Sequence, residues 1–201
     1  MMKKSKAYRI AIRAILTALI ILQTMIPFLG YIPLGLTNLT IIHITVIVAA
    51  IVLGTKDGMF VGLMWGLFTM IRVWTFPTTL FDTTVFTNPI IAVLPRVLVG
   101  LVAGWSFSWL YQRGRRLVFS SMVAAVLGTL TNTLLVLFFM GTLYTEFAAA
   151  MYQTTTSHLV IVLGTIAVTN GVSEIIAAVI LTPVFVKAIQ GIRHLRFVEE
   201  K

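Results

Sequence analysis

The sequence predicts an all-α membrane protein, a single domain of six transmembrane helices over residues 1–201 with both termini in the cytoplasm. Hydrophobic residues make up 59% of the chain and charged residues 10%, and the mean hydropathy is +1.02. A backbone in lipid must satisfy its own hydrogen bonds, so apolar runs of about 20 residues indicate spanning helices. We place these helices at 9–29, 38–54, 58–74, 90–112, 117–143 and 159–187.

The orientation follows from the basic residues. Thirteen of the 15 Lys and Arg residues lie at the two ends of the chain or in connectors on one side of the predicted bundle. The positive-inside rule makes that side cytoplasmic. The net charge of +9 therefore reports orientation and contact with anionic lipid of the bilayer, and we expect no nucleic-acid partner. The two exceptions are Arg72 and Arg96.

Catalytic motifs are missing from the chain. It has no Cys, no nucleophile elbow, no zinc-protease motif and no P-loop, because Gly54 to Gly58 is not followed by Lys-Ser/Thr. His43, His158 and His194 are too scattered to predict a metal site, and we expect the first two to be interfacial polar residues. We therefore expect no catalytic residue, no metal and no cofactor.

Small residues recur at helical spacing in three of the predicted helices. In lipid, helices are held together by close approach through such residues. Gly58, Gly62 and Gly66 in the third helix, and Gly100 and Gly104 in the fourth, predict internal packing seams.

The first helix carries a stripe of alanines at spacings of four, three and four: Ala7, Ala11, Ala14 and Ala18. This stripe allows another helix to approach closely. Periodicity alone leaves two interpretations open, an internal seam or a docking face for another protein. Its extension into the basic, interfacial part of the helix favours the external partner.

Polar groups gather in the predicted external half. Arg96 opens the fourth helix after Pro95, Asn132 lies within the fifth, and Asn170 and Glu174 share a face of the sixth. Such residues are costly against lipid, so we expect them to line one outward-facing pocket with Arg96 at its rim. A guanidinium suits a carboxylate ligand. The alternatives are interhelical hydrogen bonds for the two Asn residues and, for Arg96, a pair with Asp82, a helix end or external headgroups.

Arg72 is the second candidate for anion binding, and Glu174 is either a structural partner of an inward Arg or Asn or a proton carrier. The connector from Trp74 to Pro89 is rich in Thr and Phe, which favours a lid, and its Phe81 is a candidate ligand contact. Trp65 shares a face with Arg72 and supplies either an apolar wall of the pocket or a core tryptophan.

Two segments resemble a known family: IPLGLTNLTIIHITVIVAAIVLGTKDGMFVGLMWGLF at 32–68 and TNPIIAVLPRVLVGLVAGW at 87–105. Together with the basic N-terminus and the alanine stripe, they are similar to the S component of energy-coupling factor (ECF) transporters. This is the substrate-binding membrane subunit of an ABC-type vitamin importer in the bacterial plasma membrane. The resemblance implies that the alanine stripe docks on a membrane scaffold, the T subunit, and that ATP is used by two partner ATPases.

Within this family the chain most resembles the pantothenate-specific members. A pantothenate ligand matches the residues, with Arg96 for the carboxylate, Asn132 and Asn170 for amide and hydroxyl groups, and Trp65 for methyl groups. Folate, cobalamin and pyrimidine-precursor members remain alternatives. Outside transport subunits of this kind, the alternatives are a small intramembrane enzyme using Glu174 and a self-sufficient exporter or channel. A lone helical carboxylate argues against the enzyme.

Overall fold

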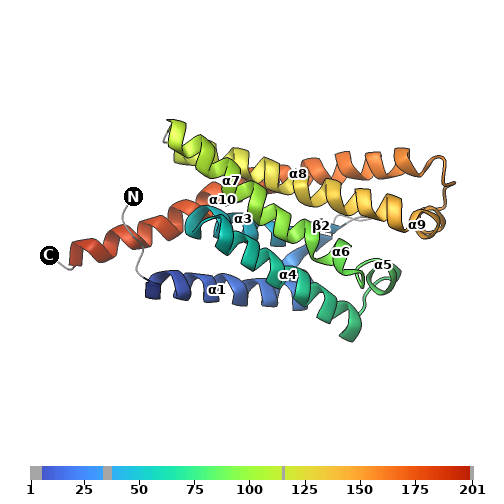
Figure 1. The fold of residues 1–201 in the computed structure, drawn as a ribbon, viewed down its shortest axis with the longest axis horizontal. Coiled ribbons are helices and arrows are strands. Elements are labelled where there is room, and N and C mark those ends of the chain that lie inside the picture. Colours follow the sequence, from blue (N-terminus) through green and yellow to red (C-terminus); the bar gives the residue numbers. More distant parts are fainter. Residues whose placement is uncertain (1–5, 34–37, 115, 200–201) are drawn as a thin grey trace.

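The computed structural model describes residues 6–33, 38–114 and 116–199, which form an elongated helical bundle (Figure 1). The predicted cytoplasmic residues Lys3, Lys4, Arg115 and Lys201 lie outside these ranges. Within them, five helices are long and apolar enough to cross a membrane. They are α1 (Lys6–Met25), α4 (Thr55–Thr75), α7 (Leu94–Gly114), α8 (Leu117–Leu143) and α10 (Leu159–Glu199). The short helix α6 (Pro89–Ala92) directly precedes α7.

The predicted second span differs from the structure. The helix expected at 38–54 is α3 (Ile42–Leu53), 12 residues long and buried along its whole length. At 1.5 Å per residue it covers about 18 Å, well short of a hydrocarbon core of about 30 Å. A helix that is apolar all round belongs inside a bundle, and that position explains the short length. His43 is therefore fully buried in α3, and our expectation of an interfacial residue was wrong.

Residues before α3 form strands, so the chain is not entirely helical. Strands β1 (Tyr31–Pro33) and β2 (Asn38–Thr40) pair antiparallel, with Tyr31 opposite Thr40, and follow the single turn α2 (Pro27–Gly30). Non-helical backbone at membrane depth is tolerated where protein or a cavity covers it. The strand pair comes directly before α3 in the chain. Its second strand takes the place of the first turn of the helix that we predicted from residue 38.

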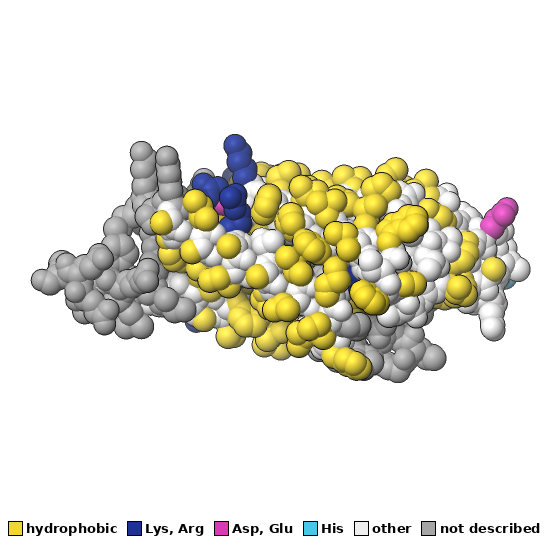
Figure 2. All heavy atoms as spheres, turned by 90° about the horizontal axis from the view of Figure 1, so that it is seen from below, with side chains coloured by type: hydrophobic (Ala, Val, Ile, Leu, Met, Phe, Trp, Pro, Cys, Tyr) yellow, Lys and Arg dark blue, Asp and Glu magenta, His cyan; other side chains and the backbone are white. Residues whose placement is uncertain are grey.

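The two ends of the bundle differ. Both ends of the described chain lie at one end, and the short helices α5 (Leu80–Thr84) and α9 (Thr145–Met151) lie at the other (Figure 1). Figure 2 shows a face largely covered by hydrophobic side chains, with Lys and Arg gathered near the terminal end. Helix α10, 41 residues long with Pro183 inside it, runs past the other helices at that end.

The predicted glycine seams meet each other. A Cβ at Gly62 would overlap the backbone oxygen of Arg96, and one at Gly66 would lie 2.7 Å from the backbone oxygen of Ala92. A Cβ at Gly100 would overlap the backbone of Gly58. Helices α4 and α7 therefore pack backbone to backbone, as small-residue faces allow. This contact sets the position of Arg96.

Candidate functional site

A cavity of about 590 Å³ lies in the half of the bundle away from the termini, between α4, α7, α8 and α10. Strands β1 and β2 and the α5 region also line this cavity. Its volume is within the usual range for small-molecule sites, about 300–1,000 Å³. All of the residues that we predicted as ligand contacts line it: Trp65, Arg72, Phe81, Arg96, Asn132, Asn170 and Glu174. Ligand contact itself stays a prediction for each of them.

Arg96 is buried in the first turn of α7, with 6% of its surface exposed. Its guanidinium lies over the ring of Trp65 at 4.9 Å and that of Phe86 at 5.4 Å. One terminal nitrogen donates to the backbone oxygen of Ile91, whereas Nε has no hydrogen-bond partner among the described residues. In the described part of the chain no carboxylate lies within ion-pair distance of Arg96, so its guanidinium makes no ion pair there, although the charge of Glu174 acts on it across the cavity.

Asp82, the alternative partner of Arg96, pairs instead with Arg72. Arg72 donates from Nη2 to Oδ1 at 2.8 Å and from Nη1 to Oδ2 at 3.4 Å, and both side chains are buried. This fork connects the end of α4 to α5 in the connector over the cavity. Arg72 therefore faces the cavity with a charge that is already paired.

The Asp82 carboxylate also organises the connector around it. It accepts from the backbone nitrogen and hydroxyl of Thr78, at 2.9 and 2.6 Å, and caps α5 together with Thr79. Burial raises the pKa of Asp82, but the Thr78 hydrogen bonds and the Arg72 charge outweigh it, so the pKa lies below its usual value. The acid is thus ionised at neutral pH.

Glu174 has a different set of partners from the ones we expected. Its Oε1 accepts from the backbone nitrogen of Thr40 and its Oε2 from the hydroxyl of Thr133, each at 3.0 Å. The hydrogen-bond partners are threonines, whereas Arg96 interacts with Glu174 through its charge without an ion pair. Glu174 joins β2, α8 and α10 at the cavity wall, with 5% of its surface exposed.

Other polar atoms at the cavity are unpaired. The carboxamide oxygen of Asn132 and the indole nitrogen of Trp65 are buried without a partner within the described residues. Buried polar groups are normally hydrogen-bonded, and an orphan costs about 1–3 kcal/mol. Together with Arg96 Nε, they provide two donors and one acceptor for a polar molecule in the cavity.

An aromatic cluster closes the cavity from the connector side. Phe81 makes an edge contact with Phe147, 5.7 Å between centroids, and lies 5.5 Å from the ring of Tyr152. Burial raises the pKa of Tyr152, which keeps its hydroxyl protonated at neutral pH. These rings come from two segments, so the predicted lid is shared between the α5 connector and the α9 region.

Sequence reasoning missed several cavity residues. Tyr31 and Thr40 were not singled out because their segment carries no strand signal; the predicted second helix began at residue 38. Thr133 follows Asn132 and also faces the cavity. Phe86 was considered only as part of the lid, although its ring covers Arg96. A single threonine or aromatic residue within an apolar sequence belongs to no motif of fixed spacing. Nothing in the sequence therefore marks it as a ligand contact.

The alanine stripe lies away from this cavity. Ala7, Ala11, Ala14 and Ala18 are all exposed on α1. The terminal end of α1 is held to the α3–α4 turn by buried Asp57, whose oxygens lie 2.5 Å from Arg9 Nε and 3.3 Å from Arg13 Nη1. These contacts hold α1 against the bundle on the face opposite the stripe.

With this geometry in place, the chain can be assigned to a class: residues 8–186 match the model of the ECF transporter substrate-specific component, and the chain belongs to that family. Two relatives are named for a substrate. The chain is 40% identical over 134 residues to the "Pantothenate transporter PanT" of Leuconostoc mesenteroides subsp. mesenteroides, covering 64% of each protein. It is 34% identical over 206 residues to the "Pantothenic acid transporter PanT" of Lactococcus lactis subsp. cremoris, covering 96% of this chain and 99% of that protein.

These findings confirm the resemblance predicted from the sequence. The family and both relatives are transporters, so the chain is a multi-pass membrane transport protein and not an enzyme. The intramembrane enzyme based on Glu174 is thereby excluded. Among the described residues no group of His, Asp and Glu is arranged to hold a metal ion.

Proposed function

We propose that this chain is the capture subunit of an ECF importer of the bacterial plasma membrane and that it binds pantothenate from outside the cell. The observation that carries the proposal is the buried guanidinium of Arg96 in the wall of the cavity, which makes no ion pair with any described residue. A buried charge is costly unless a partner compensates it, and an anionic ligand provides that partner. The names of the two relatives support pantothenate as this anion.

The charges around the cavity give the ligand an orientation. Pantothenate has one carboxylate, one amide and two hydroxyl groups. We place the carboxylate at Arg96 and the hydroxyl groups near Glu174, because Glu174 is an acceptor that attracts donors and repels an anion. Asn132 and Asn170 then bind the amide or a hydroxyl, and Trp65 covers the methyl groups.

The same charges argue against the alternative vitamins. Folate carries two carboxylates, whereas Arg96 is the cavity arginine that makes no ion pair among the described residues, because Asp82 pairs with Arg72. Cobalamin is much larger than pantothenate, and a cavity of about 590 Å³ supports the smaller ligand. A pyrimidine precursor with a single carboxylate stays the nearest competitor.

Delivery into the cell requires partners in this proposal. The exposed alanine stripe of α1 docks on the T subunit, and two cytoplasmic ATPases bound to that scaffold use ATP. The exposure of all four alanines supports this role, because close helix approach needs a small-residue face that is not already covered. The terminal end of the bundle, where α1 begins, is the cytoplasmic end.

Isothermal titration of the purified full chain tests the substrate. Pantothenate should bind without ATP and with an affinity on the order of nanomolar, since the cavity desolvates charge-assisted hydrogen bonds. Folate and a pyrimidine-precursor carboxylate serve as competitors. A clear isotherm with either competitor and none with pantothenate would overturn the specificity while leaving the family assignment in place.

A further inference from the structure

A strip of exposed side chains runs along the last turns of α7, far from the cavity. Leu101, Trp105, Trp109 and Arg113 follow one another at four-residue spacing and so lie on one face of the helix. The opposite face is buried, with Ala103, Gly104 and Phe107 packed inside the bundle. Exposed fractions of 63% for Trp105 and 45% for Trp109 place both rings on the outer surface.

The side chains of the strip are in contact with one another. The rings of Trp105 and Trp109 stack with centroids 6.4 Å apart and 19° between their planes. The guanidinium of Arg113 lies 4.0 Å from the centre of the Trp109 ring. Three neighbouring side chains thus form a continuous surface that becomes more polar toward the helix end.

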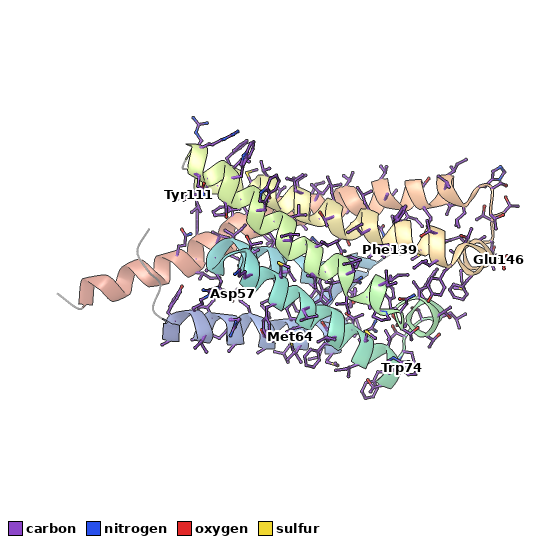
Figure 3. The ribbon with its side chains drawn as sticks, in the orientation of Figure 1. Asp57, Met64, Trp74, Tyr111, Phe139 and Glu146 are labelled. Atoms are coloured by element: carbon purple, nitrogen blue, oxygen red, sulfur yellow. The ribbon has the colours of Figure 1, made fainter. Side chains whose placement is uncertain are left out.

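Arg113 differs from Arg9 and Arg13, the arginines near the beginning of α1. Arg9 and Arg13 share the carboxylate of Asp57, whereas no acidic side chain of the described residues lies within ion-pair distance of Arg113. Figure 3 shows Asp57 and Tyr111 toward the terminal end of the bundle and Trp74 and Glu146 toward the cavity end. The strip therefore lies where the net basic charge gathers.

We propose that Trp105, Trp109 and Arg113 bind the headgroup of an anionic phospholipid of the inner leaflet. The order from Leu to Trp to Arg along α7 matches the order of a bilayer from hydrocarbon through the interface to the phosphates. The Arg113 guanidinium binds the lipid phosphate with its planar fork, and Trp109 fixes its orientation by stacking. The lipid then fixes the depth of α7 in the membrane.

The chain offers matched controls for both parts of this site. Trp74 is 72% exposed but lies at the cavity end, and no arginine of the described residues stacks on it. Arg116 is an exposed arginine three residues after Arg113 that lies over no aromatic ring within the described part of the chain. Trp109→Leu and Arg113→Gln remove the two halves of the site. Trp74→Leu and Arg116→Gln remove the same chemistry elsewhere.

Native mass spectrometry of the purified full chain tests the proposal, with phosphatidylglycerol and phosphatidylcholine of identical acyl chains as probes. Wild type should retain phosphatidylglycerol in preference, and Arg113→Gln should reduce that retention at least about tenfold, the factor for a lost hydrogen bond to a charged group. Trp109→Leu should reduce it in the same direction. Trp74→Leu should change it less than about twofold, because it lies outside the stacked strip. Arg116→Gln should reduce it by no more than about fivefold, the factor for one basic residue at an anionic surface.

Three outcomes would overturn the inference. Equal retention of the two lipids by wild type would make the strip a contact for something other than an anionic headgroup. Equal losses in Arg113→Gln and Arg116→Gln would indicate diffuse attraction to positive charge without a built site. Wild-type retention by Trp109→Leu would exclude the stacked geometry. All four side chains are exposed, so unchanged melting temperatures should show that each variant is folded.

Discussion

At the cavity wall, the buried guanidinium of Arg96 lies over two aromatic rings and, unlike that of Arg72, makes no ion pair with a carboxylate of the described residues. Both arginines are exceptions to the positive-inside pattern in the sequence, with Arg96 the first and Arg72 the second candidate for anion binding. The structure distinguishes them by their partners. Arg72 pairs with Asp82 and supports the lid, whereas Arg96 is free to pair with a ligand.

Replacing Arg96 should therefore weaken ligand binding. Arg96→Gln should cost about 1.5–3 kcal/mol of pantothenate binding, the range for a hydrogen bond to a charged group. Arg96→Lys should recover only part of the loss, because an ammonium lacks the planar fork and stacks poorly between rings. Titration calorimetry measures both. A folded Gln variant with wild-type affinity would show that the anion is held elsewhere.

The pair of Arg72 and Asp82 should act on the lid. Arg72→Gln leaves a buried carboxylate unpaired and should destabilise the α5 connector by about 3–5 kcal/mol, with faster ligand release. Asp82→Asn should do the same, and the double variant should cost less than the sum of the two. Release rates from stopped-flow measurements give the comparison, and strictly additive effects would contradict the pairing.

The pH dependence of this contact has a definite sign. The pKa of Asp82 is lowered in the folded chain, so the contribution of the pair is complete above the ordinary value of 3.8 and is lost as pH falls through the lowered one. Ligand release should therefore not accelerate between pH 7 and 5 through this group. An acceleration in that window that disappears in Asp82→Asn would contradict the assignment.

Among the elements, the α4–α7 seam and the short α3 build the site. The seam brings the backbone of Arg96 against Gly62, and α3 begins deep enough to leave room for the cavity beneath β1 and β2. The seam comes from a face of glycines and α3 from a short apolar sequence. Each positions the cavity through the way its helix packs against its neighbours.

Adding one methyl group should test the seam. Gly62→Ala places a Cβ onto the backbone oxygen of Arg96, so it should destabilise the fold by about 1–3 kcal/mol and also weaken pantothenate binding. Gly164→Ala in α10 is the matched control, because its Cβ would meet nothing within 4 Å. Unfolding in detergent and calorimetry measure the two effects. Equal behaviour of the two variants would mean that α4 and α7 are not closely packed in the membrane.

In the whole molecule, the cavity and the alanine stripe lie in opposite halves of the bundle. The cavity uses the second half of α4 and the first turns of α7, whereas the stripe occupies the terminal part of α1. Ligand capture and scaffold docking therefore use separate surfaces and should respond to separate substitutions.

The double variant Ala14→Leu and Ala18→Leu should separate these functions. Both alanines are exposed, so the isolated chain should fold and bind pantothenate as wild type, while co-purification with the scaffold and transport should fall sharply. Gly164→Leu adds similar bulk at an open position on another spanning helix and should leave both intact. Loss of ligand binding with scaffold association preserved would show that the stripe is not the docking face.

Comparison of the predicted spans with the helices of the structure shows which of them periodicity and hydropathy can predict. The helix expected at 117–143 has those bounds in the structure, and the helices expected at 58–74 and 159–187 begin within a few residues of α4 and α10. These elements are long and apolar, so the lipid constraint alone specifies them. The helix expected at 38–54 is shorter in the structure, at Ile42–Leu53. A helix buried inside the bundle does not need the length of about 20 residues that crosses lipid, and the sequence alone does not reveal that burial.

By itself, the sequence determined the membrane class, the resemblance to the family, and the polar side chains that line the cavity at Arg72, Arg96, Asn132, Asn170 and Glu174, because polar side chains in apolar helices are costly unless they face a cavity or a partner. Only the tertiary structure decided which arginine is neutralised, which carboxylate accepts from Thr40 and Thr133, and that the alanine stripe is exposed. Asp82 lies 10 residues from Arg72 and 14 from Arg96, so separation along the chain favours neither pair strongly. The choice depends on how the connector folds back over the end of α4, and that is a property of packing in three dimensions.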